Sequence, residues 1–194
     1  GYNYQGAISN SHSLGSVTLS GESAENAGGF IGANMSGSII LCFAMGNVYS
    51  EDSDVGGFAG KNTGNIEKCY ATGKVTGYSV VGGFVGANEQ NAATIENCYC
   101  KGEVIGTTSG HQYVGGFAGE NTVQAQLVNC YSTGKVTSPN TTFDDIGGFL
   151  GSNNNSAPAS YQGIVTNSYW DNITSAITTS NGGEGKGTAD MKTE

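Results

Sequence analysis

A short alternation of small or apolar residues with polar or aromatic ones recurs along the chain. In the copy at residues 69–75, the odd positions hold Cys, Ala, Gly and Val, whereas the even positions hold Tyr, Thr and Lys. A period of two is typical of a β-strand that buries one face. We therefore predict a strand whose small and apolar residues point inward and whose tyrosine points outward.

This strand phrase returns many times, with a second phrase between its copies. It occupies residues 8–17, 39–48, 66–75, 95–104, 127–136 and, in a looser form, 165–174. The second phrase is centred on Gly-Gly-Phe and occupies residues 27–34, 55–62, 81–88, 114–121 and 146–153. The pattern does not decide which face of this second phrase points inward. Phe58 and Asn62 share one face, Val55 and Ala59 share the other, and both faces carry apolar residues.

The repeats predict an all-β fold, a β-solenoid or parallel β-helix of about six stacked glycine-rich coils over residues 1–174. Helices are disfavoured, because each glycine costs about 1 kcal/mol in a helix interior and no apolar stripe of helical period runs through the units. One unit is too small to bury its apolar face alone, so neighbouring copies must stack. Residues 175–194 are predicted to form a C-terminal closing segment or a tail.

Trp170 interrupts one inward column of the predicted stack. The same position in earlier copies holds the small residues Ala44, Ala71, Cys100 and Ser132. A tryptophan fits there if no coil stacks beyond it, or if the chain leaves its helical path. We therefore expect Trp170 to cap the last coil.

The charge composition excludes several classes of partner. The net charge is −9, and the 7 basic residues are all lysines. Nucleic-acid binders need clustered cations, so nucleic acid is excluded as a partner, and an anionic membrane surface is disfavoured for the same reason. No apolar run approaches the roughly 20 residues that span a bilayer, so we expect no membrane insertion by this segment. Because the chain starts partway through a repeat, we expect it to be part of a longer chain with flanking domains.

The Gly-Gly-Phe phrases resemble the GLUG repeat, here as GGFVG, GGFAG and GGFLG followed by an asparagine. The resemblance covers residues 6 to about 174, and residues 168–192 look like the segment that closes such arrays. It implies an exported bacterial setting, as in large surface proteins, adhesin-like proteins and the regions beside the protease domain of some IgA-cleaving metallopeptidases. It implies no catalytic residues.

Four of the five cysteines share one repeat position: Cys42, Cys69, Cys98 and Cys130. Parallel strands in register hold such side chains parallel, with Cα atoms about 5 Å apart, a distance that a disulfide also allows. We expect free, buried thiols that pack as small hydrophobes, as Ser11 and Ser168 at the same position suggest. The alternatives are disulfides or a metal site, although Cys98 and Cys100 lack the C-x-x-C spacing of zinc sites.

Two sets of polar residues recur near turns. An asparagine follows each Gly-Gly-Phe phrase, at Asn34, Asn62, Asn88, Asn121 and Asn153, and we expect these amides to form a ladder between coils, with ligand contact as the alternative. Carboxylates precede two of the phrases and are candidate calcium ligands, with a solvated loop as the alternative: Asp52, Asp54, Asp144 and Asp145. The two histidines, His12 and His111, do not indicate a catalytic triad.

Aromatic residues form the one predicted surface column that could bind a partner. The candidates are Phe43, Tyr70, Tyr99, Tyr131 and Tyr169, with His12 in the same frame. Strips of rings can hold a glycan or a protein, and packing along the sheet is the alternative. We therefore expect a non-catalytic module of an extracellular or cell-surface bacterial protein, adhesive or structural, with no cofactor. The alternative is a carbohydrate-active β-helix enzyme or its substrate-binding accessory domain.

Overall fold

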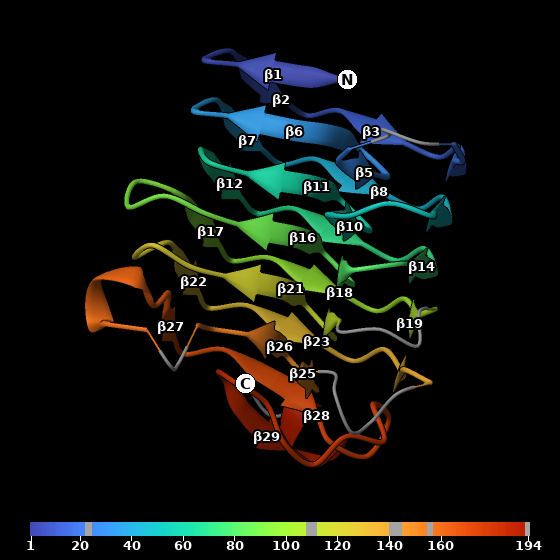
Figure 1. Ribbon diagram of the computed structural model, residues 1–194, viewed down its shortest axis with the longest axis vertical. Coiled ribbons are helices and arrows are strands. Elements are labelled where there is room, and N and C mark those ends of the chain that lie inside the picture. The colour runs from blue at the N-terminus through green and yellow to red at the C-terminus, as the bar shows by residue number, and fades with distance from the viewer. Residues whose placement is uncertain (22–24, 108–111, 140–144, 155–156, 193–194) are drawn as a thin grey trace.

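The computed structural model describes residues 1–21, 25–107, 112–139, 145–154 and 157–192. In this part of the chain short strands wind into coils, and the coils stack along one axis (Figure 1). Each strand pairs in parallel with the strand at the same position in the next coil, as Asn62 does with Asn88 and Tyr70 with Tyr99. The predicted all-β solenoid is confirmed.

Three of the five parallel sheets, named A, B and C, extend from the first coil to the last. Sheet A contains β1 (Tyr2–Tyr4), β6 (Ile31–Met35), β11 (Ala59–Asn62), β16 (Val85–Asn88), β21 (Ala118–Asn121) and β26 (Leu150–Ser152). Sheet B contains β2 (Ala7–Ser9), β7 (Ser38–Ile40), β12 (Asn65–Glu67), β17 (Thr94–Glu96), β22 (Gln126–Val128) and β27 (Ile164–Thr166). Sheet C contains β3 (His12–Ser13), β8 (Phe43–Ala44), β13 (Tyr70–Ala71), β18 (Tyr99–Cys100), β23 (Tyr131–Ser132), β28 (Tyr169–Asp171) and β29 (Glu184–Lys186).

The other two sheets, D and E, are shorter. Sheet D contains β4 (Val17–Leu19), β9 (Val48–Ser50), β14 (Val75–Gly77), β19 (Val104–Gly106) and β24 (Val136–Thr137). Sheet E contains β5 (Ala27–Gly28), β10 (Val55–Gly56), β15 (Val80–Gly82), β20 (Tyr113–Gly115) and β25 (Asp145–Gly147). The helical elements of the described chain are the 3-10 turns η1 (Ala159–Tyr161) and η2 (Asp190–Lys192). None of its helices has the length and apolar character needed to cross a membrane.

A complete coil passes through sheets E, A, B, C and D in that order, as β10 to β14 do. In the described residues four coils have all five strands, and these coils begin at β5, β10, β15 and β20. A partial coil precedes them (β1 to β4) and another follows (β25 to β28). The predicted count of about six coils therefore corresponds to four complete coils and two partial ones.

The strand phrase is split by the corners of the coil. The residue before each cysteine position has a left-handed backbone with φ between 46° and 57°, at Asn10, Leu41, Lys68, Asn97, Asn129 and Asn167. A second corner lies within residues 69–75, because β13 and β14 belong to different sheets. These residues therefore form no single strand, contrary to our expectation. The predicted faces are nevertheless confirmed, because Cys69, Ala71 and Val75 are buried while Tyr70 lies on the outer side.

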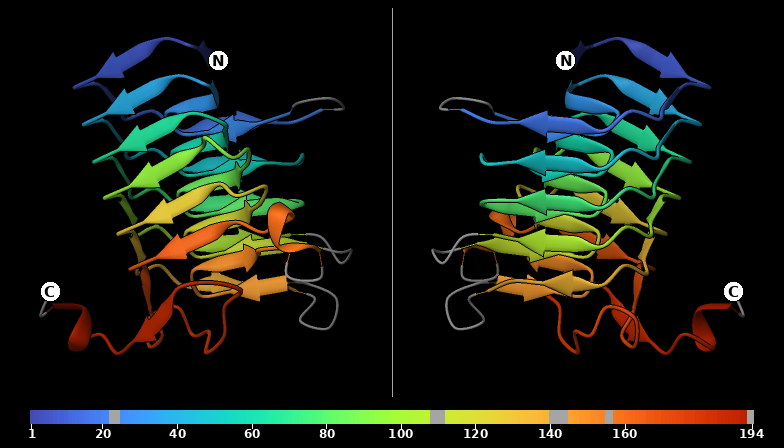
Figure 2. Two further views of the ribbon diagram at one scale, coloured as in Figure 1. Left: turned by 90° about the vertical axis from the view of Figure 1, so that its left-hand side faces the viewer. Right: turned by 90° about the vertical axis from the view of Figure 1, so that its right-hand side faces the viewer.

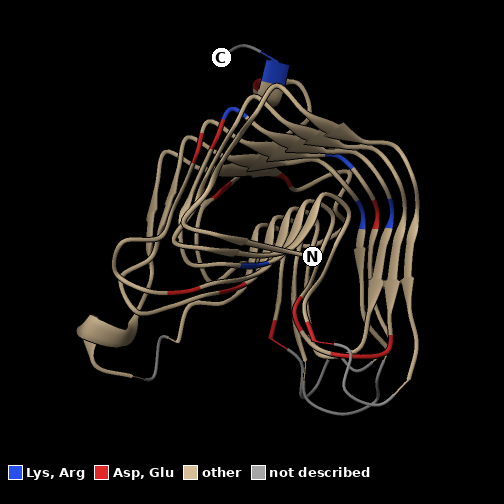
Figure 3. Cartoon of the chain, turned by 90° about the horizontal axis from the view of Figure 1, so that it is seen from above, with Lys and Arg blue, Asp and Glu red and all other residues tan. Residues whose placement is uncertain are grey.

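Sheets E and A lie back to back inside the solenoid, so the Gly-Gly-Phe phrase folds inward between the outer walls (Figure 3). The turn between β10 and β11 reverses the chain, and the two strands approach through glycines. A Cβ atom at Gly60 would lie 2.6 Å from the carbonyl oxygen of Asp54, a distance that no side chain tolerates. Glycine at this position is therefore required for the inner pair of sheets.

The inner pair of sheets divides the interior into two cores. The larger core, enclosed by sheets A, B and C, contains Phe58, Ile66 and Ala71 with their copies in other coils. The smaller core, between sheets D and E, contains Val55 and Val75 with theirs. Val55 is thus buried in the smaller core, whereas Phe58 and Ala59 are buried in the larger one. Because the turn between β10 and β11 interrupts the alternation, the sequence pattern could not assign one inward face.

Residues 171–192 lie across the C-terminal end of the stack (Figure 2). Ile177 packs against the smaller core, and the Ser180 hydroxyl accepts a hydrogen bond from the Leu150 amide at 2.8 Å. Trp170 is buried in the inward column, as predicted, but β29 stacks beyond it. The indole fits because Gly185 lies opposite Trp170 in that strand. The predicted boundary at residue 174 stays a prediction.

Candidate functional site

The solenoid aligns equivalent residues of successive coils in columns, and each candidate site is one of these columns or a hollow beside one. The aromatic column lies on the outer face of sheet C. Successive rings from His12 to Tyr131 stack with centroids 5.0–5.1 Å apart and interplanar angles of 3–8°. The rings are therefore stacked face to face in one column that runs along the solenoid axis.

Stacking covers the ring faces of this column and leaves mainly edges and hydroxyls in solvent. Burial raises the pKa of Tyr99 and of Tyr131, which agrees with their partly enclosed positions. Two ammonium groups also cover rings: Lys101 Nζ lies 5.2 Å from the centroid of Tyr99 and Lys186 Nζ 3.7 Å from that of Tyr169. The structure brings the predicted column together, and any partner would meet ring edges and hydroxyls rather than open faces. Its binding role stays a prediction.

The asparagine ladder forms at the end of sheet A, as predicted. The Nδ2 of each asparagine donates to the Oδ1 of the next at 2.8–2.9 Å, from Asn3 through Asn34, Asn62 and Asn88 to Asn121. These side chains are buried, so the amides are fully used in structural hydrogen bonds.

The ladder differs from the prediction at both ends. Asn3 is an additional member, which the sequence analysis missed although Asn3 and Gly6 repeat the spacing of Asn34 and Gly37. Asn153 leaves the ladder and donates to the carbonyl oxygen of Gly163 at 3.3 Å. The chain changes course there, so sequence spacing alone placed Asn153 incorrectly.

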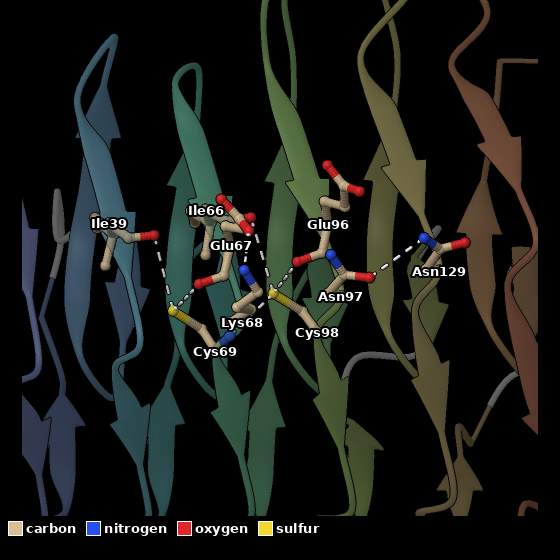
Figure 4. A network of polar contacts seen from close by, with 9 residues as sticks. All are labelled: Ile39, Ile66, Glu67, Lys68, Cys69, Glu96, Asn97, Cys98 and Asn129. Atoms are coloured by element: carbon tan, nitrogen blue, oxygen red, sulfur yellow. Dashed lines mark hydrogen bonds and ion pairs between the residues drawn. The ribbon is translucent and has the colours of Figure 1, made fainter.

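The cysteine column lies at the corner between sheets B and C (Figure 4). All five cysteines are free and buried, as predicted. The Cys69 thiol donates to the carbonyl oxygen of Glu67 at 3.2 Å, and the Cys69 amide donates to Cys98 Sγ at 3.3 Å. Burial raises the pKa of Cys98 and of Cys100 well above the ordinary thiol value, so these groups stay protonated and unreactive.

The acidic candidates do not converge on a metal site in the described chain. Asp54 is half-buried, and this burial raises its pKa; its carboxylate accepts a hydrogen bond from the Ser53 hydroxyl at 2.9 Å. Asp52 accepts one from the Ser53 amide at 2.8 Å, and Asp145 is exposed. Asp144 and His111 lie outside the described residues. Among the described residues no group of three or more His, Cys, Asp or Glu side chains could hold a metal ion.

A hollow that the sequence analysis missed lies between the outer face of sheet A and the segments that lead into β5 and β10. This lateral pocket has a volume of about 450 Å³ and is lined by Tyr2, Glu25, Asn26, Ala33, Met35, Asp52, Ser53, Asp54 and Lys61. Lys61 Nζ forms an ion pair with Glu89 Oε2 at 2.8 Å beside it. These residues come from three coils, so no single repeat phrase of the sequence could have predicted the pocket.

The comparisons with known proteins agree with the repeat geometry. The family model described as the GLUG motif matches three segments, residues 52–76, 77–105 and 110–137. The chain carries GLUG repeats. Each matched segment spans nearly one coil, and the third continues into β24, so a GLUG repeat in this fold is one turn of the solenoid. The searches of curated proteins and of solved structures each returned no match.

Proposed function

We propose that this GLUG-repeat module is a non-catalytic structural part of a larger bacterial surface protein, where it acts outside the cell as a rigid spacer or adhesive segment. The observation that carries the proposal is the internal use of the recurring columns. Asparagine amides bond to one another, thiols bond to the backbone, and aromatic faces stack on their own copies. Such columns stiffen a rod and leave few groups free to act on a substrate.

The extracellular setting is supported by the resemblance to GLUG repeats. A net charge of −9 with few cations keeps such a module from adhering to anionic polymers. A rod with loops at its corners can hold neighbouring domains apart or present those loops to a host glycan or protein.

Small-angle X-ray scattering combined with a hydrolysis screen tests this proposal. We expect a scattering curve that one rigid particle of the shape in Figure 1 reproduces, and no release of reducing sugar from a panel of polysaccharides. A flexible ensemble in solution would contradict the spacer role, and sugar release would contradict the non-catalytic role.

A carbohydrate-active enzyme is the second candidate, because Glu120 has the character of a general acid. Burial, followed by the charges of Glu89 and Asp54, raises its pKa from 4.5 to about 6. If the hydrolysis screen finds activity, Glu120→Gln should abolish it. Activity that survives this substitution would exclude Glu120 as the acid.

A glycan-binding or protein-binding role for the aromatic column is the third candidate. It is favoured by the single line of exposed tyrosine edges on sheet C. A glycan array with Tyr70→Ala and Tyr99→Ala tests it: we expect binding that both substitutions weaken, and binding unaffected by either would exclude the column.

A further inference from the structure

The lateral pocket is confined to the first coils of the solenoid. Sheet E begins next to Asn26 and Asp54 in these coils, whereas Val80 and Tyr113 take the corresponding positions in the next two. On the facing strand, Lys61 is followed by Ala87 in the next coil. The hollow therefore lies where Asn26 and Asp54 take the positions that Val80 and Tyr113 hold in the later coils.

Two polar groups of the pocket wall can accept further hydrogen bonds. The Oδ1 atom of Asn26 is buried and accepts no hydrogen bond in the described chain. A buried acceptor without a donor costs about 1–3 kcal/mol, and such atoms are rare in native structures. Asp54 is half-buried, and the Ser53 hydroxyl donates to it at 2.9 Å. A ligand that brings hydrogen-bond donors would satisfy the acceptor of Asn26 and add a donor to Asp54.

The exposed aromatic ring of Tyr2 lines the same pocket. Tyr2 is 67% exposed, in contrast to the half-buried tyrosines of sheet C that stack on one another. Met35, on the paired strand β6, also lines the pocket. A ring beside hydrogen-bonding side chains suits the two faces of a sugar, whose C–H groups pack on an aromatic face while its hydroxyls bond at the side.

We propose that the lateral pocket binds a neutral or amino saccharide, which packs on Tyr2, donates hydroxyl or ammonium hydrogens to Asn26 Oδ1 and Asp54, and accepts a hydrogen bond from Lys61. The pocket wall carries more negative than positive charge, because the carboxylates of Glu25, Asp52 and Asp54 outnumber the one ammonium group of Lys61. The pocket therefore repels anionic sugars. A spacer needs no ligand, so this inference does not depend on the proposed spacer role.

The test is a two-dimensional NMR titration of the full chain with glucose, N-acetylglucosamine, glucosamine and glucuronate. We expect saturable shifts at the Asn26 side-chain amide and at the backbone amides of Tyr2 and Lys61 with at least one of the first three sugars. Glucuronate should bind at least tenfold more weakly. The absence of shifts with all four sugars, or equal binding of glucuronate, would overturn the proposal.

Matched substitutions separate the pocket from the rest of the surface. Tyr2→Ser and Lys61→Met should each weaken binding at least fivefold. Their controls are Tyr4→Ser, on the same strand but outside the pocket, and Lys74→Met, which removes a similar ion pair with Glu103 at 3.1 Å on another face. Controls that weaken binding equally would overturn the proposal. Shifts confined to Tyr70 and Tyr99 would also overturn it, and would favour the aromatic column instead.

Discussion

Asparagine at the end of sheet A combines a donor and an acceptor in one short side chain. Asn62 accepts from Asn34 at 2.9 Å and donates to Asn88 at 2.8 Å, so each amide satisfies the coil on either side. No other uncharged side chain of this size offers both groups in one plane. The recurrence of asparagine therefore reflects hydrogen-bond geometry inside the fold.

Asn62→Ala should lower the free energy of unfolding by about 2–4 kcal/mol, because it leaves Asn34 Nδ2 and Asn88 Oδ1 buried and each without a ladder partner. Urea unfolding measures the loss. Asn65→Ala, at an exposed position in the next strand, is the control and should change stability by under about 0.5 kcal/mol. Equal effects of the two substitutions would refute a structural ladder.

Glu120 should make stability depend on pH near neutrality. Its pKa in the folded chain is about 6, above the ordinary value of 4.5, so the folded state holds the proton more tightly than the unfolded state does. The ionised carboxylate therefore costs stability above pH 6, and this cost disappears as the pH falls toward 4.5. Lys61 limits the cost because its charge lowers the pKa.

Glu120→Gln should accordingly raise the melting temperature at pH 7.5, by about 2–4 °C, and change it little at pH 4.5. Calorimetry at both pH values measures this difference. Glu96→Gln, which removes a carboxylate from the outer face of sheet B, provides the comparison. A Glu120→Gln variant that is stabilised equally at both pH values would contradict the assigned cause.

At the scale of the element, a short strand can hold a large residue only where its neighbour makes room. In β28 the indole of Trp170 is 6% exposed and donates from Nε1 to the carbonyl oxygen of Ile177 at 3.1 Å. Gly148 and Gly185 lie against the ring, one between β25 and β26 of the same coil and one on β29. Trp170 thus joins the closing segment to the last coil, in addition to the contacts of Ile177 and Ser180.

Trp170→Ala should destabilise the chain by about 3–5 kcal/mol, the range for a large buried aromatic residue. Native fluorescence should be blue-shifted and should move to the red on unfolding. Tyr161→Ala, at a 55% exposed position, should have little effect. A native emission maximum like that of tryptophan in water would show that the cap is wrong.

The corner elements that carry the cysteines should be chemically inert. Titration with a thiol reagent should find almost no reaction in the native protein and five free thiols after unfolding without reductant. Fewer than five thiols after unfolding would reveal a disulfide and contradict the packing account.

At the scale of the whole molecule, the inner pair of sheets is what distinguishes this solenoid from a simple hollow coil. Sheets A and E use glycine to approach closely, and the two cores on either side keep the valines of sheets D and E apart from the phenylalanines. The phenylalanine rings stack through the larger core at 4.8–4.9 Å. The stability of every coil therefore depends on the spacing of this inner pair.

Gly60→Ala should destabilise the chain by about 3 kcal/mol, because its Cβ would lie 2.6 Å from the carbonyl oxygen of Asp54 and force the two sheets apart. Gly15→Ala is the matched control, since a Cβ there meets nothing within 4 Å. Thermal unfolding compares the two variants. Equal tolerance of both substitutions would refute the close approach of the sheets.

The sequence by itself determined the fold class, the direction of most side chains in sheets C and D, and the columns that stacking creates. An alternation of period two shows directly which residues are buried when the other face of the strand is exposed to solvent, as for Cys69 and Tyr70. A repeated phrase must stack in register, because one coil cannot bury its own apolar face. The asparagine ladder followed from these two rules, apart from its ends at Asn3 and Asn153.

Only the tertiary structure decided what lies on both sides of the Gly-Gly-Phe phrase and where the lateral pocket forms. Val55 and Phe58 are both buried, and a pattern that assumes one buried face cannot assign two cores. The pocket joins Tyr2, Asn26 and Lys61 from three coils, across loops of unequal length. Local periodicity carries no information on such contacts, because they depend on how the coils turn and on which side chains leave space between them.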